Sequence, residues 1–126
     1  MELQHRRTTT EDADVLASLF VNNVDDSYIT ASEVIWGRAV AGSGWVDNLH
    51  DVVKDEIHKS IDDPSKVIVT FLLDGRVAGY TFSALRGAQS AEVEDMVLAR
   101  DLRGAGIGRE MFAITGEYLR ACGCNT

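Results

Sequence analysis

The segment that most constrains the fold is a pair of β-rich runs joined by a two-residue turn. The run Lys66–Leu73 is rich in β-branched and aromatic residues, and Arg76–Leu85 has the same character. Between them stands Asp74-Gly75, a dipeptide typical of tight hairpins. After a further turn over residues 86–90, Ala91–Leu98 forms a third run. The sequence therefore predicts three consecutive antiparallel strands.

A glycine-rich stretch, Arg103-Gly104-Ala105-Gly106-Ile107-Gly108, follows these strands and opens an amphipathic helix over residues 106–122. Backbone N–H groups at the start of a helix point into one small concavity, and the helix dipole favours negative charge there. Glycines also leave the backbone open to a ligand. The stretch therefore predicts a site for an anionic group such as a phosphate.

Two other phosphate motifs are excluded by spacing. A dinucleotide-binding fingerprint has glycine at a third position, where this chain has Arg109 or Met111, depending on the starting glycine. That fingerprint also belongs to a parallel strand–helix–strand unit, whereas this turn follows a β-meander. A P-loop ends in Gly-Lys-Ser or Gly-Lys-Thr, and the chain has neither.

The residues before the meander predict a strand and helices. Gln4–Arg7 is expected to form a first strand, and Thr10-Glu11-Asp12 supplies a cap and first-turn acids for a helix. A second helix is expected over Asn48–Ile61, where Asp62-Asp63-Pro64 ends it. Residues 28–40 are also expected to be helical, before a flexible turn over 42–44. Strands and helices in this order predict an α/β layered structure.

Composition limits the function. A chain of 126 residues fits one domain, residues 1–126, and its formal net charge is −8. This charge argues against general binding to nucleic acid or anionic membranes. It suits a cationic or amine-bearing partner, although a surplus of this size often only aids solubility. No run is long enough to span a bilayer, and the N-terminus lacks the apolar core of a signal peptide. Cys122 and Cys124 are expected to stay reduced in the cytoplasm, and no set of metal ligands is apparent.

The glycine stretch and its flanks resemble a known family. Arg103, Gly106 and Gly108 match the pattern Arg/Gln-x-x-Gly-x-Gly, which resembles the coenzyme A loop of the GNAT superfamily of N-acetyltransferases. Val93–Leu98 is similar to the family's fourth strand, and Ile107–Leu119 to its third helix. Residues 6–14 are also similar to the N-terminal segment of the family. The order of predicted strands and helices along residues 1–126 agrees with the order in the family.

The resemblance implies a three-layer α/β/α fold with a mostly antiparallel central sheet, described as α+β in some schemes. It implies acetyl-CoA as cosubstrate and an acetyl group transferred to an amine of a small molecule or peptide. The backbone N–H of Met96 would also donate a hydrogen bond to the carbonyl oxygen of the thioester as negative charge develops on that oxygen. The residues implied in cofactor binding are Met96, Val97, Leu98, Arg103, Gly104, Ala105, Gly106, Ile107, Gly108 and Arg109.

Two glutamates are candidates for the base. An amine with a pKa near ~10 must lose a proton before or during attack on the thioester. Strict alternation would place Glu92, Glu94 and Met96 on one face of the strand. Glu94 is preferred because it is closer to Met96, although an exposed acidic face or a pair with an arginine explains the glutamates equally well. A bulge, which family members often have in this strand, would disturb the alternation.

The family's usual general acid is a tyrosine on a helix after the fifth strand, and we expect no such helix within residues 1–126. Tyr118 is expected in the core, and Tyr80 lies in a strand. Tyr28, Trp36 and Trp45 are candidates to line the acceptor pocket.

The sheet is expected to be incomplete at its C-terminal side, since the fifth strand would begin at residues 124–126. Three interpretations stay open. The chain is a shortened form of a longer enzyme and inactive alone, or a homodimer or partner chain completes the sheet. In the third, it is a non-catalytic module that binds CoA or a protein.

Overall fold

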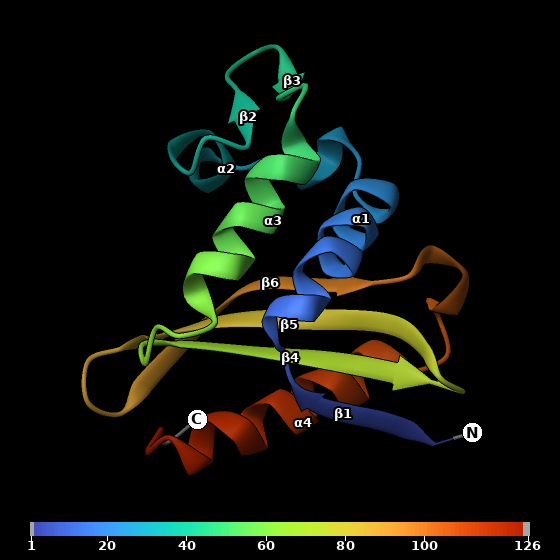
Figure 1. Cartoon of the computed structure of the whole chain (residues 1–126), viewed down its shortest axis with the longest axis vertical. Helices are drawn as coiled ribbons and strands as arrows, with labels where there is room; N and C mark the ends of the chain where they lie inside the picture. The colour runs from blue at the N-terminus through green and yellow to red at the C-terminus, as the bar shows by residue number, and fades with distance from the viewer. Residues whose placement is uncertain (1, 125–126) are drawn as a thin grey trace.

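A four-stranded antiparallel sheet has two long helices on one face and one on the other (Figure 1). This computed structural model describes residues 2–124, apart from the side chains of Asp26 and Ala31. The elements are β1 (Leu3–Arg7), η1 (Thr10–Asp12), α1 (Ala13–Asn23), η2 (Asp26–Tyr28), α2 (Ala31–Ile35), β2 (Ala39–Val40), β3 (Gly44–Trp45), α3 (Leu49–Ser60), β4 (Lys66–Leu73), β5 (Arg76–Arg86), β6 (Ser90–Leu98), η3 (Arg100–Leu102) and α4 (Ile107–Ala121).

The central sheet has the order β1-β4-β5-β6, and each neighbouring pair is antiparallel. Asp74 (φ 53°) and Gly75 (φ 79°) both have positive φ, as a tight hairpin between β4 and β5 requires. The predicted meander and the α/β class are therefore confirmed. Within residues 2–124, no strand pairs with the outer edge of β6.

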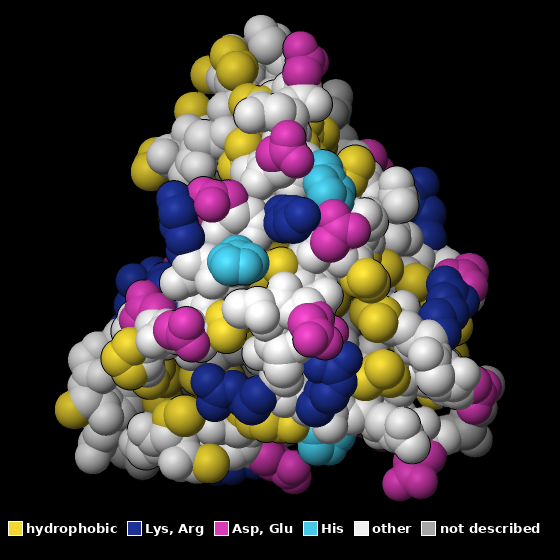
Figure 2. Space-filling view, viewed as in Figure 1, with side chains coloured by type: hydrophobic (Ala, Val, Ile, Leu, Met, Phe, Trp, Pro, Cys, Tyr) yellow, Lys and Arg dark blue, Asp and Glu magenta, His cyan; other side chains and the backbone are white. Residues whose placement is uncertain are grey.

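Helices α1 and α3 cover one face of the sheet, and α4 covers the other (Figure 1). The core on the first face includes Leu16, Phe20 and Val53. On the second face, Met111 of α4 is fully buried, and the hydroxyls of Thr115 and Thr81 are 2.7 Å apart in a buried hydrogen bond. Acidic and basic side chains are interspersed over the α1 and α3 face (Figure 2).

The prediction of a helix over residues 28–40 is wrong for most of that range. Only Ala31–Ile35 is α-helical, and the chain then turns at Gly37 (φ 80°) into β2, which pairs with β3. The turn carries Arg38 into the interior, where its side chain is 2% exposed. Local apolar spacing does not reveal this, because two of the acids that contact Arg38, Glu56 and Asp95, lie far away in the sequence.

Gly79 marks the closest approach between β5, β6 and α4. A Cβ atom added there would lie 2.4 Å from the carbonyl oxygen of Val97 and 2.8 Å from Cε of Met111. We therefore expect Gly79→Ala to lower the free energy of unfolding by at least about 2 kcal/mol in urea denaturation, because the backbone of β6 must move. The matched control is Gly116→Ala, in the middle of α4, where the nearest atom is the flexible end of Arg120 at 3.3 Å. That variant should be neutral or gain up to about 1 kcal/mol, and equal losses in the two would contradict the packing argument.

No helix within residues 2–124 has the length and apolar character needed to cross a membrane.

Candidate functional site

The glycine-rich loop joins β6 to α4 at one end of the sheet. Gly106 is the N-cap of α4 in a left-handed conformation (φ 79°), and Gly104 has φ 88°. The first N–H groups of a helix have no acceptor inside the helix, so those of Ile107, Gly108 and Arg109 are available to a ligand. A Cβ atom at Gly104 or Gly106 would meet nothing within 4 Å, so the backbone is open to solvent there. This arrangement fits an anionic group.

Gly108 brings the start of α4 against β6. A Cβ atom at Gly108 would lie 3.3 Å from Cε of Met96 and 4.0 Å from Cδ2 of Leu98. Both side chains therefore point toward α4, and the N-terminus of the helix sits beside the last residues of the strand. The open loop and the end of β6 thus form one continuous surface.

The open edge of β6 presents backbone N–H groups. The N–H of Ala99 donates to the carbonyl of Ala78 on β5 at 2.8 Å. Because backbone direction alternates along an antiparallel strand, the N–H groups of Met96 and Leu98 point to the open edge, and that of Val97 points to β5. The Val97 side chain is buried under α1 and α3. The edge therefore offers Met96 and Leu98, but not Val97, to a ligand lying along it.

The expected alternation of side chains on β6 is wrong, because a bulge interrupts the strand. Phe82 pairs with Asp95 and Ser83 pairs with Val93, so Glu94 has no residue opposite. The faces exchange at this point, with Val93 packing toward α4 while Asp95 lies toward Arg38 and α3. Glu94 therefore does not share a face with Met96.

The bulge turns Glu94 toward a cavity of about 240 Å³ between α3 and the sheet. Its side chain is 8% exposed, with Oε2 2.8 Å from Nη2 of Arg86 and Oε1 3.6 Å from Nζ of Lys66. Glu92 lies outside the cavity lining, is 62% exposed and approaches Arg86 at 3.4 Å. The pairing with Arg86 is the arginine alternative considered above. The two glutamates therefore differ in burial, since Glu94 is almost buried and Glu92 is exposed.

A network of ion pairs centred on the buried Arg38 forms part of the wall of the same cavity. Arg38 donates two hydrogen bonds to Asp95, at 3.0 and 2.9 Å, one to Glu56 at 2.7 Å and one to Glu33 at 3.3 Å. Its guanidinium also lies 5.3 Å from the ring centre of Trp36, a predicted acceptor-site residue. The cavity is lined by Trp36, Arg38, Glu56, Lys59, Ser60, Lys66, Phe82, Glu94 and Asp95.

The network contains three carboxylates around one guanidinium. Burial raises the pKa of both Glu33 and Glu56, and their contacts with Arg38 offset part of that effect. Burial opposes the charge on Arg38, but hydrogen bonds and charges from Asp95 and Glu56 hold its pKa above the ordinary value. Sequence reasoning missed this network, since its residues come from three separated segments, around residues 33–38, 56 and 95.

The two arginines predicted to bind the cofactor have different surroundings. The guanidinium of Arg103 donates to the carbonyls of Asn23 at 2.8 Å and Leu98 at 3.4 Å, and it lies 5.9 Å from the ring centre of Tyr28. Arg109 is exposed on the first turn of α4. Arg103 therefore anchors the loop to the end of α1, a role that its spacing in the motif does not reveal.

Tyr80 on β5 and Tyr118 on α4 both contribute to the packing of the core. Tyr118 packs against the core, and its hydroxyl oxygen lies 2.8 Å from Nδ1 of His5. Tyr80 is fully buried, which raises its pKa well above the ordinary value. Trp45 packs edge-on against Phe20 rather than lining the cavity. Of the aromatic candidates, Trp36 therefore lies closest to Glu94, since both line the same cavity.

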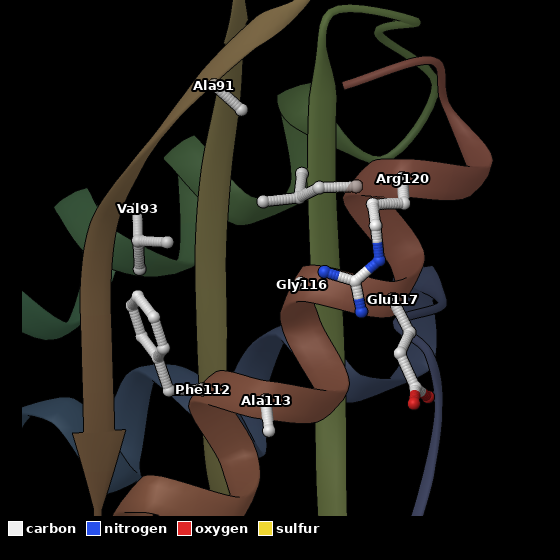
Figure 3. A pocket seen from close by; sticks show the side chains of 8 residues that line it. Ala91, Val93, Phe112, Ala113, Gly116, Glu117 and Arg120 are labelled. Atoms are coloured by element: carbon white, nitrogen blue, oxygen red, sulfur yellow. The ribbon is translucent and has the colours of Figure 1, made fainter. Parts of the chain in front are cut away.

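A larger apolar groove of about 540 Å³ lies between β6 and α4, on the stretch of the helix from Phe112 to Arg120 (Figure 3). Val93 and Phe112 face each other across it, and Phe112 is 58% exposed. The groove is lined by Ala91, Val93, Phe112, Ala113, Gly116, Glu117, Leu119 and Arg120. The fifth strand expected from residues 124–126 falls mostly on residues 125–126, which lie outside the described residues.

Comparison with known families gives a match over most of the sequence. Residues 30–126 match the acetyltransferase (GNAT) family. The chain belongs to this family. The coenzyme A loop of the GNAT resemblance, residues 103–109, falls within the matched region. No curated protein matches the chain.

Solved structures share the GNAT fold at low sequence identity. An acetyltransferase from Thermus thermophilus is 24% identical, with a TM-score of 0.70 over 98% of this chain and 72% of that one. A PaiA N-acetyltransferase from Thermoplasma acidophilum, solved with coenzyme A, is 13% identical, with a TM-score of 0.65 over 96% and 74%. A ribosomal-protein-alanine N-acetyltransferase from Brucella melitensis is 12% identical, with a TM-score of 0.69 over 99% and 76%. These similarities establish the three-layer fold.

Proposed function

We propose that this GNAT chain uses acetyl-CoA to acetylate an amine of a small molecule or peptide. The observation that carries the proposal is the open glycine loop at the end of β6, next to a bulge that turns Glu94 into a cavity. The proposed compartment is the cytoplasm, where the free thiols of Cys122 and Cys124 stay reduced.

The loop would hold the pyrophosphate of the cosubstrate. Its anionic oxygens would accept hydrogen bonds from the first N–H groups of α4, and Arg109 adds positive charge nearby. The pantetheine arm would lie along the open edge of β6, where Met96 and Leu98 present N–H groups. The CoA-bound relative from Thermoplasma supports this assignment at the level of the fold.

The cavity would receive the acceptor amine. In the proposed reaction Glu94 takes a proton from the attacking amine, either directly or through water. A bond forms between nitrogen and the acetyl carbon, and the carbon–sulfur bond breaks with its electron pair passing to sulfur. The N–H of Met96 would stabilise the negative charge that develops on the carbonyl oxygen. The thiolate leaves and takes a proton from water.

Titration calorimetry of the full chain with CoA and acetyl-CoA is the first test. Binding of both ligands, followed by release of free thiol when an amine acceptor is added, supports the transferase function. Absence of both heat and thermal stabilisation would overturn the assignment of the loop for this chain.

Substitution of the loop N-cap gives a sharper result. Gly106→Ala places a side chain at φ 79°, which costs about 1–2 kcal/mol and displaces the N–H groups that face the ligand. We expect CoA binding to weaken about tenfold, since 1.4 kcal/mol corresponds to a factor of ten. The control is Gly87→Ala in the β5–β6 turn, also at positive φ (67°) and also open to solvent. It should cost similar stability without changing CoA affinity, and equal affinity losses in both would contradict the loop assignment.

A second candidate is a non-catalytic CoA- or protein-binding module whose sheet a partner completes. The open edge of β6 and the exposed Phe112 beside the apolar groove favour this reading. Under it, CoA binds without turnover in an amine panel, and light scattering shows a dimer or a complex.

A further inference from the structure

The end of α1 is tied to the loop that precedes α4 by the side chain of Asn23. Asn23 is the last residue of α1 and is buried. Its Oδ1 accepts a hydrogen bond from the backbone N–H of Arg100 at 2.7 Å, and its Nδ2 donates to the carbonyl of Leu19 at 2.9 Å. The donation to its own helix fixes the amide so that Oδ1 faces Arg100.

A second bond ties the same point of α1 to the far end of the connection. The backbone carbonyl of Asn23 accepts from Nη2 of Arg103 at 2.8 Å. The short helix η3, Arg100–Leu102, is therefore held at both ends by one residue that lies 77 and 80 positions earlier in the chain. Three residues separate Arg103 from Ile107, the first helical residue of α4.

These bonds matter because the loop itself has little internal constraint. Its glycines at 104 and 106 have positive φ and no neighbouring atoms where a Cβ would stand. A ligand held by backbone N–H groups needs those groups fixed before binding, since ordering a loop on binding costs free energy. The constraint must therefore come from outside the loop.

We propose that Asn23 is a positioning residue for the pyrophosphate loop, acting through its hydrogen bond to the N–H of Arg100. The proposal rests on the proposed binding of CoA at residues 103–109. Loss of the side-chain acceptor removes the partner of the half-buried N–H of Arg100 and releases the start of η3. The loop then samples arrangements in which its N–H groups no longer converge.

The test compares Asn23→Ala with Asn22→Ala, a change in the preceding residue, whose side chain is exposed. We expect about tenfold weaker CoA binding for Asn23→Ala, because the hydrogen bond that fixes the loop before binding is lost, and wild-type affinity for Asn22→Ala. Hydrogen–deuterium exchange of the free proteins should quicken over residues 99–110 in the first variant and remain unchanged in the second.

A double-mutant cycle isolates the single hydrogen bond. Arg100→Ala keeps the backbone N–H, whereas Arg100→Pro removes it at the first position of η3, where proline is tolerated. In the Arg100→Ala background, Asn23→Ala should weaken CoA binding and quicken exchange in the loop. In the Arg100→Pro background, Asn23→Ala should add little to either effect, because the N–H that it would leave without an acceptor is already absent.

Fully additive effects, or a lower melting temperature with unchanged CoA affinity and uniform exchange, would overturn the positioning role. If the wild-type chain binds no CoA, the proposed function fails by itself. The exchange measurements on the free variants still decide whether Asn23 fixes the loop.

Discussion

Arg38→Met is expected to lower the free energy of unfolding by about 3–5 kcal/mol, the range for removing one partner of a buried ion pair. The guanidinium is 2% exposed and is the cation that Asp95, Glu56 and Glu33 share. Its removal leaves buried carboxylates without a counter-charge. Methionine fills a similar volume, so the loss reflects charge and hydrogen bonding more than a cavity.

Urea denaturation at neutral pH measures this effect. Arg38→Lys keeps the charge but lacks the planar fork that holds both oxygens of Asp95, so we expect an intermediate loss. Adding Asp95→Asn to Arg38→Met should recover part of the stability, because one unpaired charge is removed. A loss below about 1 kcal/mol for Arg38→Met would mean that the network contributes no more than surface pairs do.

The sign of the pH dependence follows from the raised pKa values of Glu33 and Glu56. A carboxyl group whose pKa is higher in the folded state binds its proton more tightly there than in the unfolded chain. These two groups therefore contribute stability that is present below the unfolded pKa and is lost as the pH rises through the folded pKa. We expect Arg38→Met to be less destabilising in mild acid than at neutral pH.

Glu94→Gln is expected to lower kcat for acetyl transfer by about 10²-fold or more, the usual contribution of a general base. Glutamine keeps the size of the side chain and can still accept hydrogen bonds from Arg86, but it cannot take a proton from the amine. The bulge in β6 is what turns Glu94 toward the cavity, and its side chain is 8% exposed there.

Thiol release in the presence of saturating acetyl-CoA and amine measures this loss. Glu92→Gln is the matched control, because Glu92 lies on the same strand and approaches the same arginine but is 62% exposed. We expect CoA affinity to stay unchanged in both variants and kcat to fall only in Glu94→Gln. Wild-type kcat in Glu94→Gln would exclude this residue as the base, and a fall in Glu92→Gln alone would assign the role to Glu92.

The meander and the glycine loop were predictable because their signals are local. Asp74-Gly75 specifies a tight turn through the φ angles that these two residues tolerate, and β-rich runs flank it on both sides. The loop was recognised from glycines at fixed spacing between a strand and a helix. Each of these signals lies within about ten residues of the element it predicts.

The faces of β6 could not be predicted, because a bulge depends on the partner strand. The extra residue is visible only in the pairing of Phe82 with Asp95 and Ser83 with Val93. That one insertion moves Glu94 away from the face of Met96 and aims it at the cavity. The prediction of a helix over residues 28–40 was wrong for a related reason, since two of the acids that stabilise buried Arg38, Glu56 and Asp95, lie far from it in the sequence.

The meander of β4, β5 and β6, the turn that joins β4 to β5 and the glycine loop before α4 follow from local sequence, since backbone preferences of a few adjacent residues specify each of them. Three other features arise from the folded arrangement of the whole chain. They are the glutamate that reaches a cavity, the N–H groups of β6 that point to its open edge, and the position of Arg38 in the interior. These features depend on strand register and on charges brought together from distant segments. Asn23 belongs with them, because its partners lie 77 and 80 residues away.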